Sequence, residues 1–173
     1  MFITKEVEWD MGHRIPNHKS KCRSPHGHRY KVKVTLQGKT IKSEGKSDEG
    51  MLIDYGDIKK ILIAHIHDVL DHGFMIYNKD DEMCKALVGN VTKKEDLNFK
   101  VFKPKAKYNW NIILVGFIPT AENIAKWCYD TILSETEKVF NKSLTLHSVE
   151  IYETPTSTAT YTMHDYMDAN KNG

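Results

Sequence analysis

Hydrophobic and polar positions alternate with a period of two in two segments near the start of the chain. Residues 2–10 alternate in this way, and residues 28–38 do so more clearly, with Tyr30, Val32, Val34 and Leu36 on one face and Lys31, Lys33 and Thr35 on the other. This period predicts two half-buried strands, and we expect them to pair. Residues 39–50 are polar and contain two glycines, so they predict a loop before a short strand at 51–55.

Apolar residues then recur at spacings of three and four, the period of a helix. From residue 58 to residue 70 they predict an amphipathic helix with Asp57 as its N-cap. Residues 119–140 predict a second helix, capped by Thr120, whose apolar stripe needs a sheet to cover it. Residues 149–165 predict a final hairpin around Pro155. Together these elements indicate an α+β fold with helices laid on an antiparallel sheet.

The segment from residue 78 to residue 117 interrupts this simple pattern. Residues 80–89 predict a short helix, and residues 99–102 and 111–117 predict two strands that form a hairpin. We therefore expect one domain over residues 1–173, with an extended segment at about 78–117.

Composition and charge narrow the classes of function. Lys and Arg number 25 against 23 Asp and Glu, without a long basic block, which argues against a nucleic-acid partner and favours a small-molecule substrate. The N-terminus has no secretory pattern, and the longest apolar run, residues 112–118, is too short to span a bilayer. Three scattered cysteines suit a reducing compartment. We expect a cytoplasmic protein that does not bind a membrane.

The richest chemistry lies in residues 21–30, KCRSPHGHRY. His26 and His28 are two residues apart, so both imidazoles project from one face of a strand, and pairing of the two strands would bring His13 alongside. Three imidazoles suit zinc and leave a fourth position open. An H-x-H pair also occurs by chance on protein surfaces. Cys22 could close a tetrahedral structural site as a fourth ligand, or remain free and act as a base.

Two further groups are candidates for acid–base chemistry. Asp71 precedes His72 at the predicted end of the first helix, where a carboxylate could hold an imidazole that carries protons. The same residues also fit an ordinary helix C-terminus capped by Gly73. Glu153 ends a predicted strand and could accept two N–H donors from a heterocycle edge, or simply be solvated.

In combination, these motifs resemble those of a known family. Their order is His13, Cys22 with H-G-H at 26–28, L-D-H at 70–72, P-T-A-E-N at 119–123 and Y-E-T at 152–154. It resembles the 6-pyruvoyl-tetrahydropterin synthase and 6-carboxytetrahydropterin synthase superfamily, over about residues 2–163. The Cys-x3-His spacing is closer to the carboxytetrahydropterin branch, which serves queuosine and other deazapurine synthesis.

The resemblance implies a fold, a reaction and a set of site residues. The implied fold is a tunnelling fold, in which a four-stranded antiparallel sheet carries two helices on one face and trimers assemble into a hexameric barrel with active sites between subunits. The implied substrate is 7,8-dihydroneopterin triphosphate, and the products are 6-carboxy-5,6,7,8-tetrahydropterin, acetaldehyde and triphosphate. The implied metal ligands are His13, His26 and His28. The implied catalytic residues, which transfer protons, are Cys22, Asp71, His72 and Glu153. Glu153 also binds the substrate, together with Thr120 and Glu122.

Two alternatives remain beside this lyase. One is the pyruvoyl synthase of the same superfamily, which releases no acetaldehyde. The other is a zinc-stabilised binding module without turnover, which would use Cys22 as a fourth ligand and would tolerate His72→Ala.

Overall fold

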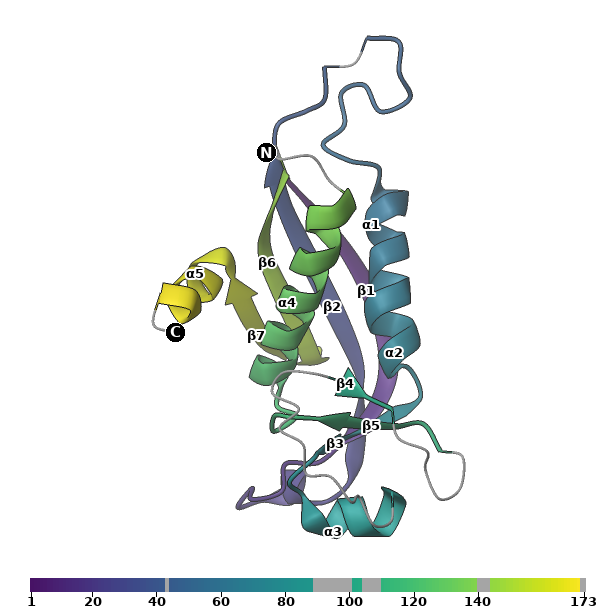
Figure 1. Ribbon diagram of the computed structural model, residues 1–173, viewed down its shortest axis with the longest axis vertical. Coiled ribbons are helices and arrows are strands. Elements are labelled where there is room, and N and C mark those ends of the chain that lie inside the picture. Colours follow the sequence, from purple (N-terminus) through teal and green to yellow (C-terminus); the bar gives the residue numbers. More distant parts are fainter. Residues whose placement is uncertain (43, 89–100, 104–109, 140–143, 172–173) are drawn as a thin grey trace.

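A computed structural model describes residues 1–42, 44–88, 101–103, 110–139 and 144–171. Its strands form a single sheet in the order β4-β5-β3-β1-β2-β6-β7. Their bounds are β1 Phe2–His13, β2 His26–Gly38, β3 Gly73–Tyr77, β4 Val101–Phe102, β5 Ile112–Val115, β6 Leu144–Thr154 and β7 Ser157–Thr162. Two long helical segments lie on one face of this sheet (Figure 1).

The antiparallel half of the sheet is built from the strands with the clearest alternation. β1 and β2 pair along their whole lengths, from Phe2 opposite Gln37 to His13 opposite His26, which confirms the predicted pairing. β2 also pairs with β6, and β6 with β7, so the predicted final hairpin is confirmed. The register places His13 and His26 side by side at one end of the sheet.

The other half of the sheet corrects the expectation of four antiparallel strands. β3 is parallel to both of its neighbours, β1 and β5, and β4 pairs antiparallel with β5. The described sheet is therefore mixed and has seven strands, of which β1, β2, β6 and β7 form the antiparallel part. The β4–β5 pairing confirms the predicted hairpin, although residues 104–109 between its strands lie outside the described residues.

The first helical segment begins earlier than predicted. α1, Tyr55–Leu62, has Asp54 as its N-cap, whose carboxylate accepts a hydrogen bond from the Gly56 N–H; the Asp57 prediction was wrong. The predicted strand at 51–55 is absent from the described structure because this stretch leads directly into α1. The helix continues through a π-helical turn, Ile63–His67, into α2, Asp68–Leu70.

The second long helix is α4, Ala121–Val139, and Thr120 caps it as predicted, since its hydroxyl lies 3.4 Å from the Asn123 N–H. A short helix, α3 Asp81–Met83, runs into a π-helical turn, Cys84–Val88, and this confirms the helix predicted there as far as residue 88. The terminal helix α5, Met163–Lys171, was not predicted. None of the described helices is long and apolar enough to cross a membrane.

The two faces of the antiparallel strands differ sharply. On the face toward α1 and α4, Trp9 stacks on Tyr30, and both are buried with Met11 and Val32 in the main core. The opposite face carries ion pairs such as Arg29 with Asp10. Because the side chain of His13 follows Trp9 and Met11 on the apolar face, it is buried at the end of the core rather than exposed.

Candidate active site

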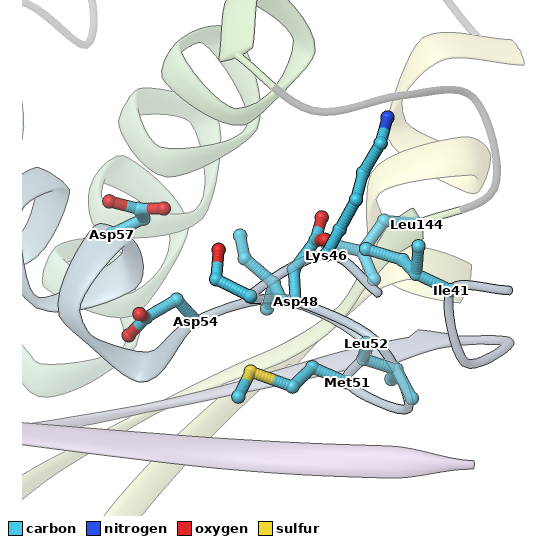
Figure 2. Close-up of a pocket in the computed structure, with 10 residues that line it drawn as sticks. Ile41, Lys46, Asp48, Met51, Leu52, Asp54, Asp57 and Leu144 are labelled. Atoms are coloured by element: carbon cyan, nitrogen blue, oxygen red, sulfur yellow. The ribbon is translucent and has the colours of Figure 1, made fainter. Parts of the chain in front are cut away.

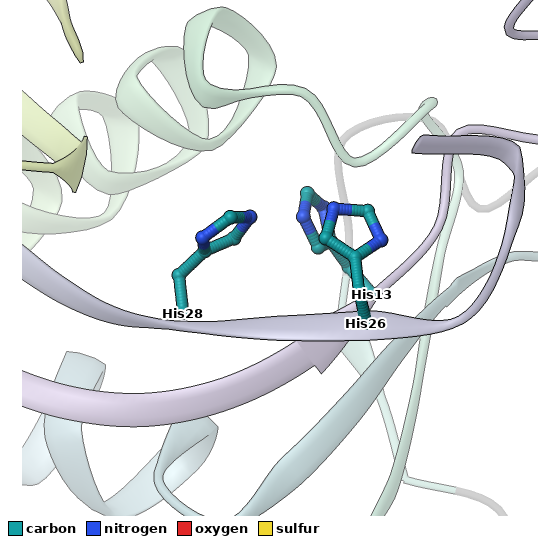
Figure 3. Close-up of side chains that lie close together, drawn as sticks. All are labelled: His13, His26 and His28. Carbon is teal, nitrogen blue, oxygen red and sulfur yellow. The ribbon is translucent and has the colours of Figure 1, made fainter. Parts of the chain in front are cut away.

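Three imidazoles converge at the end of β1 and the beginning of β2. One ring nitrogen each from His13, His26 and His28 lies within 4.8 Å of the other two. His26 and His28 rise from the same side of β2, as their spacing predicted, and His13 comes from the neighbouring strand (Figure 3). Within the described residues this is the group of side chains that could hold a metal ion.

Hydrogen bonds to backbone carbonyls orient two of the rings. The Nδ1 atom of His13 lies 2.7 Å from the Pro119 carbonyl oxygen, and that of His26 lies 2.8 Å from the Ser24 carbonyl oxygen. A carbonyl oxygen only accepts, so each Nδ1 must carry the hydrogen and each Nε2 keeps its lone pair. Such carbonyl contacts are the usual support of metal-binding histidines.

The third ring supplies the clearest sign of a fit to a metal. Nε2 of His28 is buried and has no hydrogen-bond partner among the described residues. Burial lowers the pKa of His13 and of His28, which favours the neutral imidazoles that a metal requires. The donor set and its environment therefore fit a cation with a preference for nitrogen ligands.

A cleft of about 260 Å³ lies beside His13 and contains four other predicted site residues, Cys22, Thr120, Glu122 and Glu153. Cys22 belongs to a 3₁₀ turn, Lys21–Arg23, and its carbonyl oxygen accepts a hydrogen bond of 2.8 Å from the Ile15 N–H. The sulfur is not part of the group of converging ligand atoms. Cys22 is thus placed beside the histidine cluster rather than inside it.

Glu153 reaches the cluster from the end of β6. Its Oε1 lies 3.6 Å from Nε2 of His13 and 4.0 Å from Nε2 of His28. Tyr30, which the alternation predicted only as part of one face of a strand, donates a hydrogen bond of 3.3 Å to the same Oε1. Burial and the charge of Glu153 raise the pKa of Tyr30 well above its usual value. The spacing H-x-H-x-Y, which sets all three side chains on one face, could have identified it.

Asp71 and His72 form the predicted pair, but they lie outside the cleft that contains Cys22. Oδ2 of Asp71 is 2.7 Å from Nδ1 of His72, and its Oδ1 accepts a hydrogen bond from the Asp10 N–H. The His72 side chain is 80% exposed and lines a second cleft together with Gly12 and Gly27. One chain therefore does not bring this pair into the cleft that holds Cys22.

The backbone at this point also corrects the alternative reading of Gly73 as a helix cap. The left-handed residue is His72, with φ of 54°, whereas Gly73 begins β3. Gly73 is required for space, because an added Cβ would collide with Ile113 and lie 2.8 Å from the Leu70 carbonyl oxygen.

A larger cavity, about 550 Å³, lies beyond the other end of β2 (Figure 2). Its lining includes the carboxylates of Asp48, Asp54 and Asp57. Asp54 caps α1, and Asp57 pairs with Lys60 at 2.8 Å, so two of these carboxylates have structural partners. We assign the candidate site to the cleft beside the histidine cluster, which brings together possible metal ligands and the acid–base candidates Cys22 and Glu153.

The chain is similar to known proteins over most of its length. A family described as 6-pyruvoyl tetrahydropterin synthase matches residues 2–164. A 6-carboxy-5,6,7,8-tetrahydropterin synthase of Haemophilus influenzae is 33% identical over 159 residues, covering 92% of this chain and 96% of the relative. The protein of the same name from Rickettsia bellii is 30% identical, with 88% and 93% covered.

Solved structures agree in fold. An uncharacterized protein from Wolinella succinogenes has a TM-score of 0.68 at 26% identity, covering 94% of this chain and 98% of that one. The 6-pyruvoyl tetrahydropterin synthase of Caenorhabditis elegans has a TM-score of 0.58 at 22% identity, with 94% of each chain covered, and shows the fold alone. With a family match over nearly its whole length, the chain belongs to the 6-pyruvoyl tetrahydropterin synthase family.

Proposed function

We propose that this protein converts 7,8-dihydroneopterin triphosphate and one water molecule to 6-carboxy-5,6,7,8-tetrahydropterin, acetaldehyde and triphosphate, in queuosine or related deazapurine synthesis in the cytoplasm. The observation that carries the proposal is the convergence of three histidines beside a cleft that contains Cys22 and Glu153. The names of the curated relatives favour the carboxy product.

Zinc is the proposed metal, held by His13, His26 and His28. Three neutral imidazoles are a common catalytic zinc set, and no thiol is among the converging atoms of the described residues. This supports an open site over the closed structural site that a fourth cysteine ligand would form. The chemistry that zinc supplies in an open site is Lewis acidity toward substrate oxygens.

The side chains around the cleft have separate proposed tasks. Glu153 anchors the pterin, since one carboxylate can accept two parallel N–H donors from a heterocycle edge. Thr120 and Glu122, at the beginning of α4, also line the cleft and contact the substrate. Cys22 accepts or returns a proton on the substrate side chain, a role that its position outside the ligand group leaves open.

The placement of Asp71 and His72 requires a second chain in this proposal. His72 lines a different cleft from Cys22, and its side chain is largely exposed. We propose that the pair completes the site of a neighbouring subunit in a hexamer built from two trimers. Asp71 then holds the His72 ring through Nδ1 and leaves Nε2 to exchange a proton with the substrate.

Incubation of the purified, zinc-loaded protein with 7,8-dihydroneopterin triphosphate tests the proposal. Mass spectrometry should detect 6-carboxy-5,6,7,8-tetrahydropterin, and a coupled assay should detect one acetaldehyde for each triphosphate released. Triphosphate without acetaldehyde would identify the pyruvoyl synthase that the family description names. Zinc binding without any product, unaffected by His72→Ala, would identify a binding module.

A further inference from the structure

The hydroxyl group of Tyr30 lies between the histidine cluster and Glu153. Its oxygen is 3.1 Å from Nε2 of His13, 3.3 Å from Nδ1 of the same ring and 3.3 Å from Oε1 of Glu153. The residue is fully buried, and its ring stacks on Trp9 with centroids 5.6 Å apart, so the hydroxyl has a fixed position.

A phenol has one hydrogen to donate, and two acceptors compete for it. Nδ1 of His13 is not one of them, because its hydrogen is donated to the Pro119 carbonyl oxygen. The competing acceptors are the lone pair of His13 Nε2 and the carboxylate of Glu153. A metal ion held by His13 would use that lone pair, after which only Glu153 remains as acceptor.

We propose that Tyr30 is a positioning residue that links metal occupancy to the carboxylate of Glu153. With a metal on the three histidines, the Tyr30 hydroxyl donates to Oε1 and holds the carboxylate in one orientation; without it, the hydroxyl is shared with His13. This inference rests on the proposed function, since it takes the histidines as ligands and Glu153 as the pterin anchor.

The link predicts different effects on metal binding and on substrate binding. In Tyr30→Phe the ring and its stacking on Trp9 are kept, and the hydrogen bond is lost in both states, so zinc affinity should stay within about 3-fold of the wild type. Glu153 loses a charge-assisted hydrogen bond in the loaded state, which should raise KM about 10-fold, the effect of roughly 1.4 kcal/mol, with little change in kcat.

Infrared difference spectroscopy of zinc-loaded against zinc-free protein tests the link without turnover. The wild type should show a zinc-induced shift of one carboxylate band, which Glu153→Gln identifies by its disappearance. Tyr30→Phe should abolish the shift while isothermal titration shows zinc still bound. Tyr129→Phe is the matched control, because Tyr129 is also buried and donates a hydrogen bond of 3.0 Å to the Leu146 carbonyl oxygen, within the core.

Two results would overturn the inference. If Tyr30→Phe keeps the shift, Tyr30 does not orient Glu153; if it lowers zinc affinity more than 10-fold while Tyr129→Phe does not, Tyr30 supports the ligands instead. Either outcome leaves the proposed function standing. Failure of the wild type to bind zinc would overturn both, and is recognised by the absence of any titration signal.

Discussion

Arg14 fixes the end of β1, directly after His13, to the extended segment that follows β3. Its Nε and Nη2 atoms donate to the two carboxylate oxygens of Asp80 at 2.6 and 2.8 Å, and Nη2 also donates to Glu82 at 2.9 Å. The side chains of Arg14 and Asp80 are only 12% and 3% exposed, whereas that of Glu82 is 77% exposed. The pair with Asp80 is therefore the buried one.

Burial sets the magnitude of the expected effect. Arg14→Met keeps the alkyl packing but leaves Asp80 as a buried carboxylate without its cation, and breaking such a pair costs roughly 3–5 kcal/mol. The Met83 N–H still donates to Asp80 at 3.3 Å, so we expect the lower end, about 3 kcal/mol. Glu82→Gln, which removes only the exposed partner, should cost about 0.5 kcal/mol or less.

Urea unfolding of the metal-free protein at one fixed protein concentration measures both values. Glu82→Gln is the matched control, because it removes a charged partner of the same guanidinium without leaving a buried charge unpaired. In the double variant Arg14→Met with Asp80→Asn, much of the loss should be recovered, since no unpaired charge remains buried. A loss below about 1 kcal/mol for Arg14→Met would refute the reasoning that Asp80 is shielded from water.

Three other predictions concern the site and its supports. Cys22→Ala should keep zinc and lose roughly 10²- to 10⁴-fold in turnover, whereas His26→Ala should release the metal, as metal analysis and assay together will show. Gly73→Ala should cost about 1–3 kcal/mol in urea unfolding, because the added Cβ meets Ile113 and the preceding helix. The hydrogen bond from the Asp10 N–H, and to a smaller extent His72, lower the pKa of Asp71 below 3.8. The ionised Asp71 therefore stabilises the fold above pH 3.8, and this contribution is lost as the pH falls through the lower folded-state pKa. Titration of the carboxyl groups by NMR measures this pKa.

Much of the antiparallel sheet and the histidine cluster could be predicted from the sequence because both follow from a period of two. Alternation in β1 and β2 fixed which residues share a face, and pairing of the strands then placed His13 opposite His26. Thr120 was recognisable as a cap because Ser, Thr, Asp and Asn favour that position. The same preference misled at the first helix, where Asp54 and Asp57 both qualify and only Asp54 caps.

The parts that were missed depend on contacts between distant segments. β3 is five residues long, and three of them, including Met75 and Ile76, are buried, so no alternation distinguishes it from the end of the helix before it. The role of Tyr30 depends on β6 carrying Glu153 to its hydroxyl, a separation of 123 residues. The period of two placed Tyr30 on the same face as Val32, which predicts where the ring packs but not what the hydroxyl group contacts.

The separation of Cys22 and His72 into two clefts of one chain has a genetic consequence. In the proposed hexamer, a Cys22→Ala chain would still carry an intact imidazole for its neighbour, and a His72→Ala chain would still carry an intact thiol. Homogeneous preparations of either variant should turn over much more slowly than the wild type. Co-expression of the two should restore part of the turnover, through neighbouring chains of which one supplies Cys22 and the other supplies His72.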